Sequence, residues 1–455
     1  MKNSRTLISF TVASALVAVA GGAHASGFAL IEQNASGMGN AYAGAAALAS
    51  DASTIYFNPA GMSRLPGRQV VIAGHAIRPS AEFTNTTSTL AAGQGVLGDN
   101  GGDAGDWAFV PNAYLSWQIN PTWHVGLGLN APFGLKTEYS PTWVGRFHAI
   151  ESEVKTINVN PSVAFKVNET VSLGAGINWQ RIDATLSNSV NYAGGAAAAC
   201  APQPACQGPT VAALTAAGQN QGIGTVKGDD SAWGFNLGAL FNVTPSTRVG
   251  LAYRSALNYN LTGTVAFANR PAALAAALPD GAIMASLKVP ASASASVVHQ
   301  LNPKWDLLGD ISWTEWSSVQ VLNVVRTSGV LLTTTPLNWN DTWRFSGGVN
   351  YHANDAWTLR FGVAYDQSPV PDAFRTPRIP DNDRTWLAAG GQYRASKNTA
   401  VDWGLAYLFV KDSSVNLCNA AQAAANPAAC AGKNNLVGNY SNNVKILSVQ
   451  LRQSF

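Results

Sequence analysis

Charged residues are scarce in this sequence of 455 residues, because Asp, Glu, Lys and Arg together make up only 12% of it. A typical soluble domain carries about 25%. The net charge of +3 is too small to indicate a nucleic-acid partner. After the N-terminal 25 residues, no segment has the roughly 18 continuous apolar residues that a membrane-spanning helix needs. With 47% hydrophobic residues, the chain is also too polar to resemble a helical membrane protein.

Cysteine is rare as well, and its four residues form two local pairs. These are Cys200 with Cys206 and Cys418 with Cys430, and no histidine lies near either pair in the sequence. A metal site is therefore disfavoured. We expect each pair to form a disulfide that pins a loop in an oxidising compartment.

Catalytic and cofactor motifs are missing. The histidines are scattered and no Ser/His/Asp cluster stands out, which disfavours an outer-membrane lipase or protease. Gly37-x-Gly39 starts like a dinucleotide loop, but Tyr42 stands where a third glycine is needed. We therefore expect no enzyme activity and no cofactor.

Residues 1–25 have the form of a secretory signal peptide. Lys2 and Arg5 precede an apolar run at residues 7–22, and small residues at 23–25 provide a cleavage site. A transmembrane anchor is the alternative, but the run is too short and too rich in Ala and Gly. We expect an exported chain whose mature form begins near Ser26.

Strict alternation of apolar and polar residues dominates the rest of the chain and is typical of strands with one apolar face. Clear examples are residues 123–130, 233–243 and 357–366. A soluble sandwich would also alternate. Aromatic residues at strand ends, polar faces of Gly, Asn, Ser and Thr, and alternating short and long connections favour a transmembrane barrel instead.

Six short turns and seven long loops imply about 14 strands, an even number as in bacterial barrels. The turns lie near residues 120–121, 168–169, 244–246, 302–303, 354–355 and 396–398. The loops lie near residues 84–104, 134–147, 187–230, 262–287, 319–337, 368–383 and 412–440. The last strand ends on Phe455, the usual signal for the outer-membrane insertion machinery. We therefore predict an all-β, 14-stranded antiparallel barrel over residues 67–455, in the outer membrane of a Gram-negative bacterium.

Residues 26–66 lack this alternation and are rich in small residues, which suits a partly helical plug inside a narrow lumen. A flexible periplasmic tail is the alternative. The plug would enclose the turn Asn58-Pro59-Ala60, where polar lumen residues offer Asn58 hydrogen-bond partners. We expect this turn to support gating.

Strand parity turns several charges toward the lumen, where they avoid the about 2–4 kcal/mol that Arg or Lys costs when facing lipid. These inward-facing charged residues have two alternative roles. They form a network that supports the barrel, or one or two arginines bind the carboxylate head group of a ligand while apolar walls contact its tail. These residues are Arg254, Asp306, Asp310, Arg344, Arg360, Asp366 and Arg452.

Two positions break the pattern. Continued parity would point Arg181 and Asp183 at lipid, so either a bulge lies near Gln180 or the strand has already left the hydrocarbon there. Pro132 follows the third strand and cannot donate to a ladder, which predicts a break in the wall or a simple strand end.

Several ordered motifs resemble those of the FadL/TodX family of outer-membrane transporters for long-chain fatty acids and other hydrophobic compounds. They run from Ser26 to about Tyr393, nearly the whole mature chain. They are "SGFALIEQNASGMGNAYAGAAALASDASTIYFNPAGM", "LNAPFGL", "WVGRFHAIESEVKTINVNPSVAFKV", "VSLGAGINWQ", "DQSPVPD" and "RIPDNDRTWLAAGGQY".

The resemblance implies an N-terminal hatch domain at residues 26–66 and a kinked third strand with a lateral opening. The opening would involve Pro132, Phe133 and Gly134. Phe28 resembles the family's hatch contact to the ligand, and Arg181 is the closest match to a basic contact in the fifth strand. The family's second basic contact falls near Asn340, which is uncharged and leaves room for an aromatic or uncharged substrate.

The expected function is a passive, substrate-specific channel for long-chain fatty acids, working as a monomer. Outer loops, including a short apolar helix within residues 269–284, would capture the ligand. The ligand would bind in the lumen beside the hatch, near Arg254, Arg344, Arg360 and Asp366. Release would be lateral, below the lipopolysaccharide layer and into membrane lipid. Aromatic hydrocarbons are an alternative cargo, and a plugged lumen argues against a general porin.

Overall fold

The computed structural model describes residues 27–199, 210 and 212–455. The predicted signal peptide and the predicted Cys200–Cys206 disulfide therefore lie outside the described residues. The other predicted disulfide, between Cys418 and Cys430, is confirmed, with 5.4 Å between the two Cα atoms.

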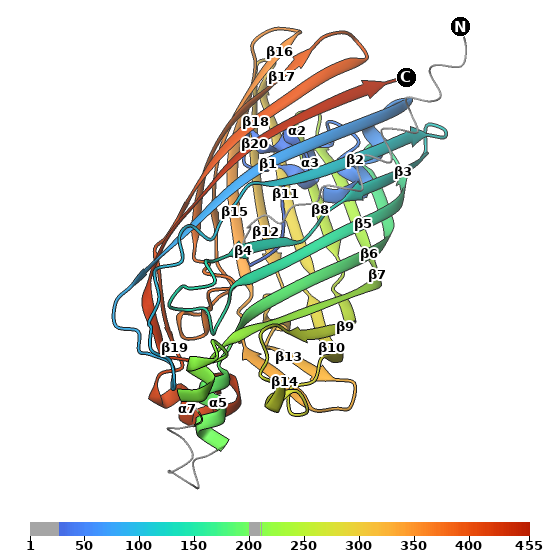
Figure 1. Cartoon of the computed structure of the whole chain (residues 1–455). Helices are drawn as coiled ribbons and strands as arrows, with labels where there is room; N and C mark the ends of the chain where they lie inside the picture. Colours follow the sequence, from blue (N-terminus) through green and yellow to red (C-terminus); the bar gives the residue numbers. More distant parts are fainter. Residues whose placement is uncertain (1–26, 200–209, 211) are drawn as a thin grey trace, which may run out of the picture.

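A closed antiparallel barrel makes up most of the molecule (Figure 1). Within the described part of the chain, its wall contains twenty strand segments. They are β1 (Arg68–Asn85), β2 (Ala108–Gln118), β3 (Trp123–Asn130), β4 (Gly134–Glu138), β5 (Glu151–Lys166), β6 (Val171–Val190), β7 (Gly222–Thr244), β8 (Thr247–Arg254), β9 (Leu257–Phe267), β10 (Gly281–Val289), β11 (Ser292–Asn302), β12 (Trp305–Thr314), β13 (Val321–Arg326), β14 (Leu331–Pro336), β15 (Thr342–His352), β16 (Trp357–Asp366), β17 (Arg384–Arg394), β18 (Thr399–Val410), β19 (Ser413–Leu417) and β20 (Leu436–Ser454).

The predicted number of 14 wall strands is confirmed, because six strands are each interrupted into two collinear pieces. For example, β3 and β4 both pair with β5, and β18 and β19 both pair with β20. The same holds for β8 with β9, β10 with β11, β12 with β13, and β14 with β15. The barrel closes where β20 pairs with β1 from Gln69↔Ser454 to Asn85↔Gly438.

The two faces of the wall differ as the alternation predicts. On β16 and β20, apolar side chains such as Phe361 and Leu447 are exposed on the outside, at 51% and 47%. Their neighbours Arg360 and Ser448 are buried inside. Aliphatic and aromatic outward faces suit lipid, and polar inward faces suit a lumen.

All six short turns lie between consecutive strands as predicted. Several long loops are shorter than predicted, because strands continue beyond the expected boundaries. Strands β6 and β7 leave only residues 191–221 between them, and the hairpin of β13 and β14 occupies residues that we expected to be a loop. The apolar helix expected within residues 269–284 is reduced to one 3-10 turn, η2 (Ala272–Leu274).

Short helices carry the remaining regular structure. Those in the outer loops are α5 (Tyr192–Ala199), α7 (Ala420–Ala425) and α8 (Pro427–Cys430), with the 3-10 turns η3 (Trp316–Ser318) and η4 (Asp372–Phe374). No helix in the described ranges has the length and apolar character needed to cross a membrane.

Residues 27–66, the N-terminal segment, are mostly buried and pack against the inner wall near the C-terminus (Figure 1). The segment contains α2 (Ala35–Met38), α3 (Ala45–Leu48), α4 (Thr54–Phe57) and η1 (Pro59–Arg64). Asn34 caps α2, since its side-chain oxygen accepts a hydrogen bond from the Gly37 amide at 2.9 Å. A Cβ on wall residue Gly362 would overlap the Asn40 backbone, so glycine in the wall permits this close packing.

Candidate functional site

A cavity of about 160 Å³ lies between the N-terminal segment and the inner wall. Apolar and aromatic side chains form most of its surface, and charged side chains from four wall strands reach it. The lining includes Leu30, Tyr42, Tyr56, Pro132, Phe133, Arg254, Asp310, Arg344, Asp366, Trp316 and Trp386.

Arg344 on β15 brings an incompletely bonded guanidinium group to this cavity. Its Nη2 donates a hydrogen bond to the Ala41 carbonyl at 2.8 Å, and its Cζ lies 5.1 Å from the centroid of the Trp386 ring. Its Nε and Nη1 are buried and have no hydrogen-bond partner within the described chain. Buried unsatisfied donors are costly, and a carboxylate is a strong acceptor for them.

Arg254 at the end of β8 is more fully engaged. One nitrogen donates to the side-chain oxygen of Asn178 at 2.5 Å and another to the Tyr56 carbonyl at 3.1 Å. Its Cζ lies 4.4 Å from the centroid of the Tyr56 ring, a cation–π geometry. Arg254 therefore ties the N-terminal segment to the wall.

Four aromatic rings gather next to the cavity. The ring centroid of Phe28 lies 5.6 Å from that of Phe133, 4.9 Å from that of Trp316 and 5.9 Å from that of Trp339. All four side chains are nearly fully buried. We call them the aromatic cluster; rings at these distances attract one another beyond simple burial.

The third wall strand bends beside this cluster. Residues 131–133 separate β3 from β4, and the N-terminal segment bonds to both sides of the bend. The Leu30 amide donates to the Pro132 carbonyl at 2.8 Å, and the Gly134 amide donates to the Phe28 carbonyl at 2.9 Å.

The hydrogen-bond ladder is interrupted at the same place. β2 pairs with β3 only as far as Ala113↔Leu129. In the described structure, residues 108–112 of β2 pair with β1 but have no ladder partner in β4. The ladder between β2 and the third wall strand therefore stops at Leu129 in the described structure.

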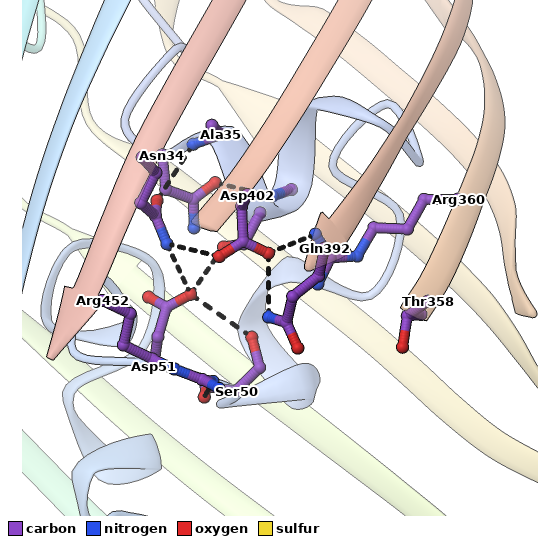
Figure 2. Close-up of polar contacts among 12 residues, drawn as sticks. Asn34, Ala35, Ser50, Asp51, Thr358, Arg360, Gln392, Asp402 and Arg452 are labelled. Carbon is purple, nitrogen blue, oxygen red and sulfur yellow. Dashed lines mark hydrogen bonds and ion pairs between the residues drawn. The ribbon is translucent and has the colours of Figure 1, made fainter. Parts of the chain in front are cut away.

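A buried polar network joins the N-terminal segment to four wall strands, β16, β17, β18 and β20 (Figure 2). Asp402 on β18 accepts from Arg360 at 2.6 Å and from the side-chain amide of Gln392 at 2.9 Å. The Gln450 amide nitrogen on β20 reaches Asp51 at 3.1 Å and Asp402 at 3.4 Å. We call these five residues the latch network, because they link segment and wall.

The turn Asn58-Pro59-Ala60 is buried. The Asn58 side-chain nitrogen donates to the carbonyls of Ala46 at 2.7 Å and Ala239 at 2.9 Å, and its oxygen accepts from the Ala60 amide at 3.0 Å. A Cβ on Gly238 would overlap Asn58, so the wall leaves room for this side chain. The turn is thus bonded both to its own segment and to β7.

Comparison with known proteins identifies the fold. A family model described as outer membrane protein transport protein (OMPP1/FadL/TodX) matches residues 16–455. The chain belongs to this family. Its members are outer-membrane transport proteins, which places the barrel in the outer membrane of a Gram-negative bacterium.

FadL/TodX relatives match over nearly the full chain. A long-chain fatty acid transport protein of Shigella flexneri is 31% identical over 427 residues, covering 90% of this chain and 93% of that protein. Outer membrane protein P1 of Haemophilus influenzae is 31% identical over 411 residues, covering 87% and 89%. A FadL homologue from Pseudomonas aeruginosa is 28% identical, with a TM-score of 0.82 over 94% of this chain and 100% of that one. The Pseudomonas putida toluene transporter TodX, at 18% identity and a TM-score of 0.61 over 89% and 94%, shares the fold.

Within this FadL/TodX barrel, the structure brings only some of the predicted ligand residues together. Arg254, Arg344 and Asp366 line the cavity, and Phe28 lies in the adjoining aromatic cluster. Arg360 belongs to the latch network. The alternation did not single out Trp316 or Trp339, because both lie outside regular strands. The sequence signal that could have found them is the presence of two tryptophans in loops.

Arg181 lies elsewhere. Its side chain is 44% exposed on the outer face of β6 and forms ion pairs with Asp183 at 3.0 Å and Asp229 at 2.9 Å. The pairing of β6 with both neighbours continues through Gln180 without a register shift, so no bulge turns Arg181 inward. The surviving alternative is that β6 has left the hydrocarbon here, and we do not include Arg181 in the candidate site.

Proposed function

We propose that this protein carries long-chain fatty acids passively across the outer membrane. The observation that carries the proposal is the cavity beside Arg344, where unpartnered guanidinium nitrogens meet apolar and aromatic walls. This combination suits a carboxylate head with a hydrocarbon tail. The relatives named as long-chain fatty acid transport proteins, which match over about nine tenths of the chain, support the same substrate class.

The size of the cavity supports a hatch role for the N-terminal segment. A volume of about 160 Å³ is close to that of an apolar cavity that holds benzene, about 150 Å³. Sites for larger ligands have about 300–1,000 Å³. A long-chain acid therefore needs the segment to move, with Asn58, Pro59 and Ala60 as its fixed end and the latch network as the contact that opens.

Release would follow a lateral route at Pro132, Phe133 and Gly134. The missing ladder between β2 and β4 supports this route, because an unpaired stretch of wall can open without breaking strand hydrogen bonds. The bonds from Leu30 and Phe28 to the bend support coupling of this opening to movement of the N-terminal segment. The ligand would then enter membrane lipid below the lipopolysaccharide layer.

Aromatic hydrocarbons are the second candidate cargo, because the cavity as it stands has the size of one aromatic ring. A general porin is disfavoured, since the N-terminal segment is mostly buried and packs against the wall strands. We further propose that the protein works as a monomer and is inserted through its C-terminal strand by the outer-membrane insertion machinery.

Uptake of radiolabelled oleate by cells that lack their own transporter tests the proposal. The full-length protein should confer saturable uptake, and Arg344→Gln should raise the half-saturating oleate concentration about tenfold, as loss of a charge-assisted hydrogen bond predicts. Arg181→Gln serves as the matched control and should behave as the parent. Absence of oleate uptake combined with toluene uptake would favour the aromatic cargo, and a steady large conductance in planar bilayers would favour a porin.

A further inference from the structure

The outward face of β20 changes from apolar to polar at one position. Its outward side chains Leu447, Val449 and Leu451 are 46–50% exposed and suit the hydrocarbon of a membrane. The next outward residue toward the long loops is Lys445, and Asn443 follows it. Lys445 therefore marks the edge of the apolar band on the side of the long loops, which face outside the cell in bacterial barrels.

Lys445 carries a charge that its neighbours leave uncompensated. It lies directly opposite Arg78 of β1 in the strand register, so two cations stand side by side. Arg78 forms an ion pair with Asp103 at 3.2 Å. The part of the chain that the structure describes offers no ion pair or hydrogen bond to the ammonium group of Lys445, which is exposed. Like charges directly opposite each other destabilise a sheet, so a bound anion would relieve this pairing.

A second lysine of the same kind stands next to it. Lys411 directly follows β18, is exposed, and has no printed side-chain partner among residues 27–199, 210 and 212–455. It lies four residues beyond Tyr407, which pairs with Lys445 in the register, and an extended chain of four residues spans about 13 Å. In contrast, four other lysines form ion pairs with glutamates; they are Lys136, Lys155, Lys166 and Lys288.

Aromatic side chains lie between and beside the two lysines. Tyr407 and Phe409 are successive outward residues of β18, and their ring centroids are 4.5 Å apart. Trp107, the residue before β2, is 62% exposed. Outward aromatic residues are typical of the level at which the hydrocarbon meets the lipid head groups. The two lysines therefore stand at head-group depth.

An apolar groove of about 430 Å³ begins at Lys445 on the outside of the wall. It crosses β17, β18 and β20, which are neighbours in the barrel (Figure 1). The small side chain of Ala389 leaves room between the larger ones, because Ala389 pairs with Leu405 and Leu405 pairs with Leu447. Besides Lys445, the outward lining consists of Trp107, Leu387, Ala389, Leu405, Tyr407 and Leu447.

We propose that Lys445 and Lys411 bind the two phosphates of one diphosphorylated glycolipid, the lipid A of lipopolysaccharide, while an acyl chain of this lipid lies in the groove below. Lipid A carries one phosphate at each end of a disaccharide and acyl chains beneath it. Two separated cations above an apolar groove match this arrangement, and lysine is a common phosphate ligand. The site faces lipid on the outside of the barrel, so the inference does not depend on the transported substrate.

Native mass spectrometry of the full-length protein in detergent, titrated with lipid A, tests the inference. The parent should bind one diphosphorylated lipid A. Lys445→Gln and Lys411→Gln should each weaken this binding about tenfold, as loss of a charge-assisted hydrogen bond predicts, whereas Lys445→Arg should retain most of the affinity. Lys304→Gln is the matched control, at an exposed lysine in the turn between β11 and β12 at the opposite end of the barrel, and should have no effect.

Lipid A that lacks one phosphate makes the test more specific. It should bind the parent about tenfold more weakly, and only one of the two glutamine variants should weaken it further, because the other lysine no longer has a partner. Unchanged binding of diphosphorylated lipid A in both variants would overturn the inference. So would equally tight binding of phosphatidylglycerol by the parent, which would indicate a general preference for anionic lipids. The heat-induced shift in gel mobility checks that each variant is folded.

Discussion

Replacing Asp402 with asparagine removes the ion-pair partner of Arg360 while keeping the shape of the side chain. The pair is 2.6 Å long, and its two side chains are 5% and 0% exposed. Removing one partner of such a buried pair costs about 3–5 kcal/mol, because the remaining charge is left uncompensated. Asp402 also accepts from Gln392 and Gln450, so the variant disturbs the link from Gln450 to Asp51.

This loss of free energy should mainly weaken the attachment of the N-terminal segment to the barrel wall. The barrel wall is held by continuous strand ladders on both sides of β18, whereas the segment depends on side-chain contacts such as Gln450 with Asp51. A loss of about 3 kcal/mol shifts an opening equilibrium by more than a hundredfold. We therefore expect Asp402→Asn to increase the frequency of single-channel openings in planar bilayers. The heat-induced shift in gel mobility that marks a folded barrel should stay unchanged.

The double variant Arg360→Met with Asp402→Leu is the control. Removing both charges of a buried pair is often close to neutral, so this variant should stay closer to the parent than Asp402→Asn does. If Asp402→Asn opens no more often than the parent, or if the double variant opens as often as the single one, the latch network does not hold the segment.

Asn58→Ala removes three buried hydrogen bonds at about 1 kcal/mol each, so it should increase leakage of small polar dyes without changing oleate binding at the loops. Substitutions around Pro132 that restore pairing between β2 and β4 should abolish uptake in a barrel that still folds; undiminished uptake would contradict lateral release. Replacing Cys418 and Cys430 with serine should loosen α7 and α8 by about 3 kcal/mol, seen as faster hydrogen exchange in residues 419–429, and a protected loop would contradict this.

The barrel could be predicted because its signals are local. Alternation with period two fixes which side chains share a face, and turn residues mark where each strand ends. These two signals sufficed for the strand number, the six short turns and the inward position of Arg344. Pro132 lies between β3 and β4, where the ladder with β2 stops, and proline cannot donate to a ladder.

The same local signals do not show where a strand leaves the membrane. Arg181 continues the outward face of β6 without a register shift, and its exposed ion pairs lie beyond the aromatic pair Trp179 and Trp233. Alternation continues in strands that extend past the hydrocarbon, so it gives no boundary. For this reason residues 187–190 and 222–230 were expected in a loop and instead form strands.

The sites depend on contacts between residues far apart in the sequence. The latch network joins Asp51 to Gln450, 399 positions away, and Arg344 reaches a carbonyl 303 positions away. No spacing rule connects such residues, since they meet only when the barrel closes around the N-terminal segment.

The first residues of the N-terminal segment join these distant parts. The Gly27 amide bonds to Asp381 of the outer loop, while Phe28 and Leu30 bond to the bend of the third strand. A ligand that displaces Phe28 from the aromatic cluster therefore disturbs both contacts at once. Because such coupling is reciprocal, a bend held open should in turn weaken the contact between Gly27 and Asp381. The geometry thus favours a barrel in which access to the inner cavity and opening of the wall change together.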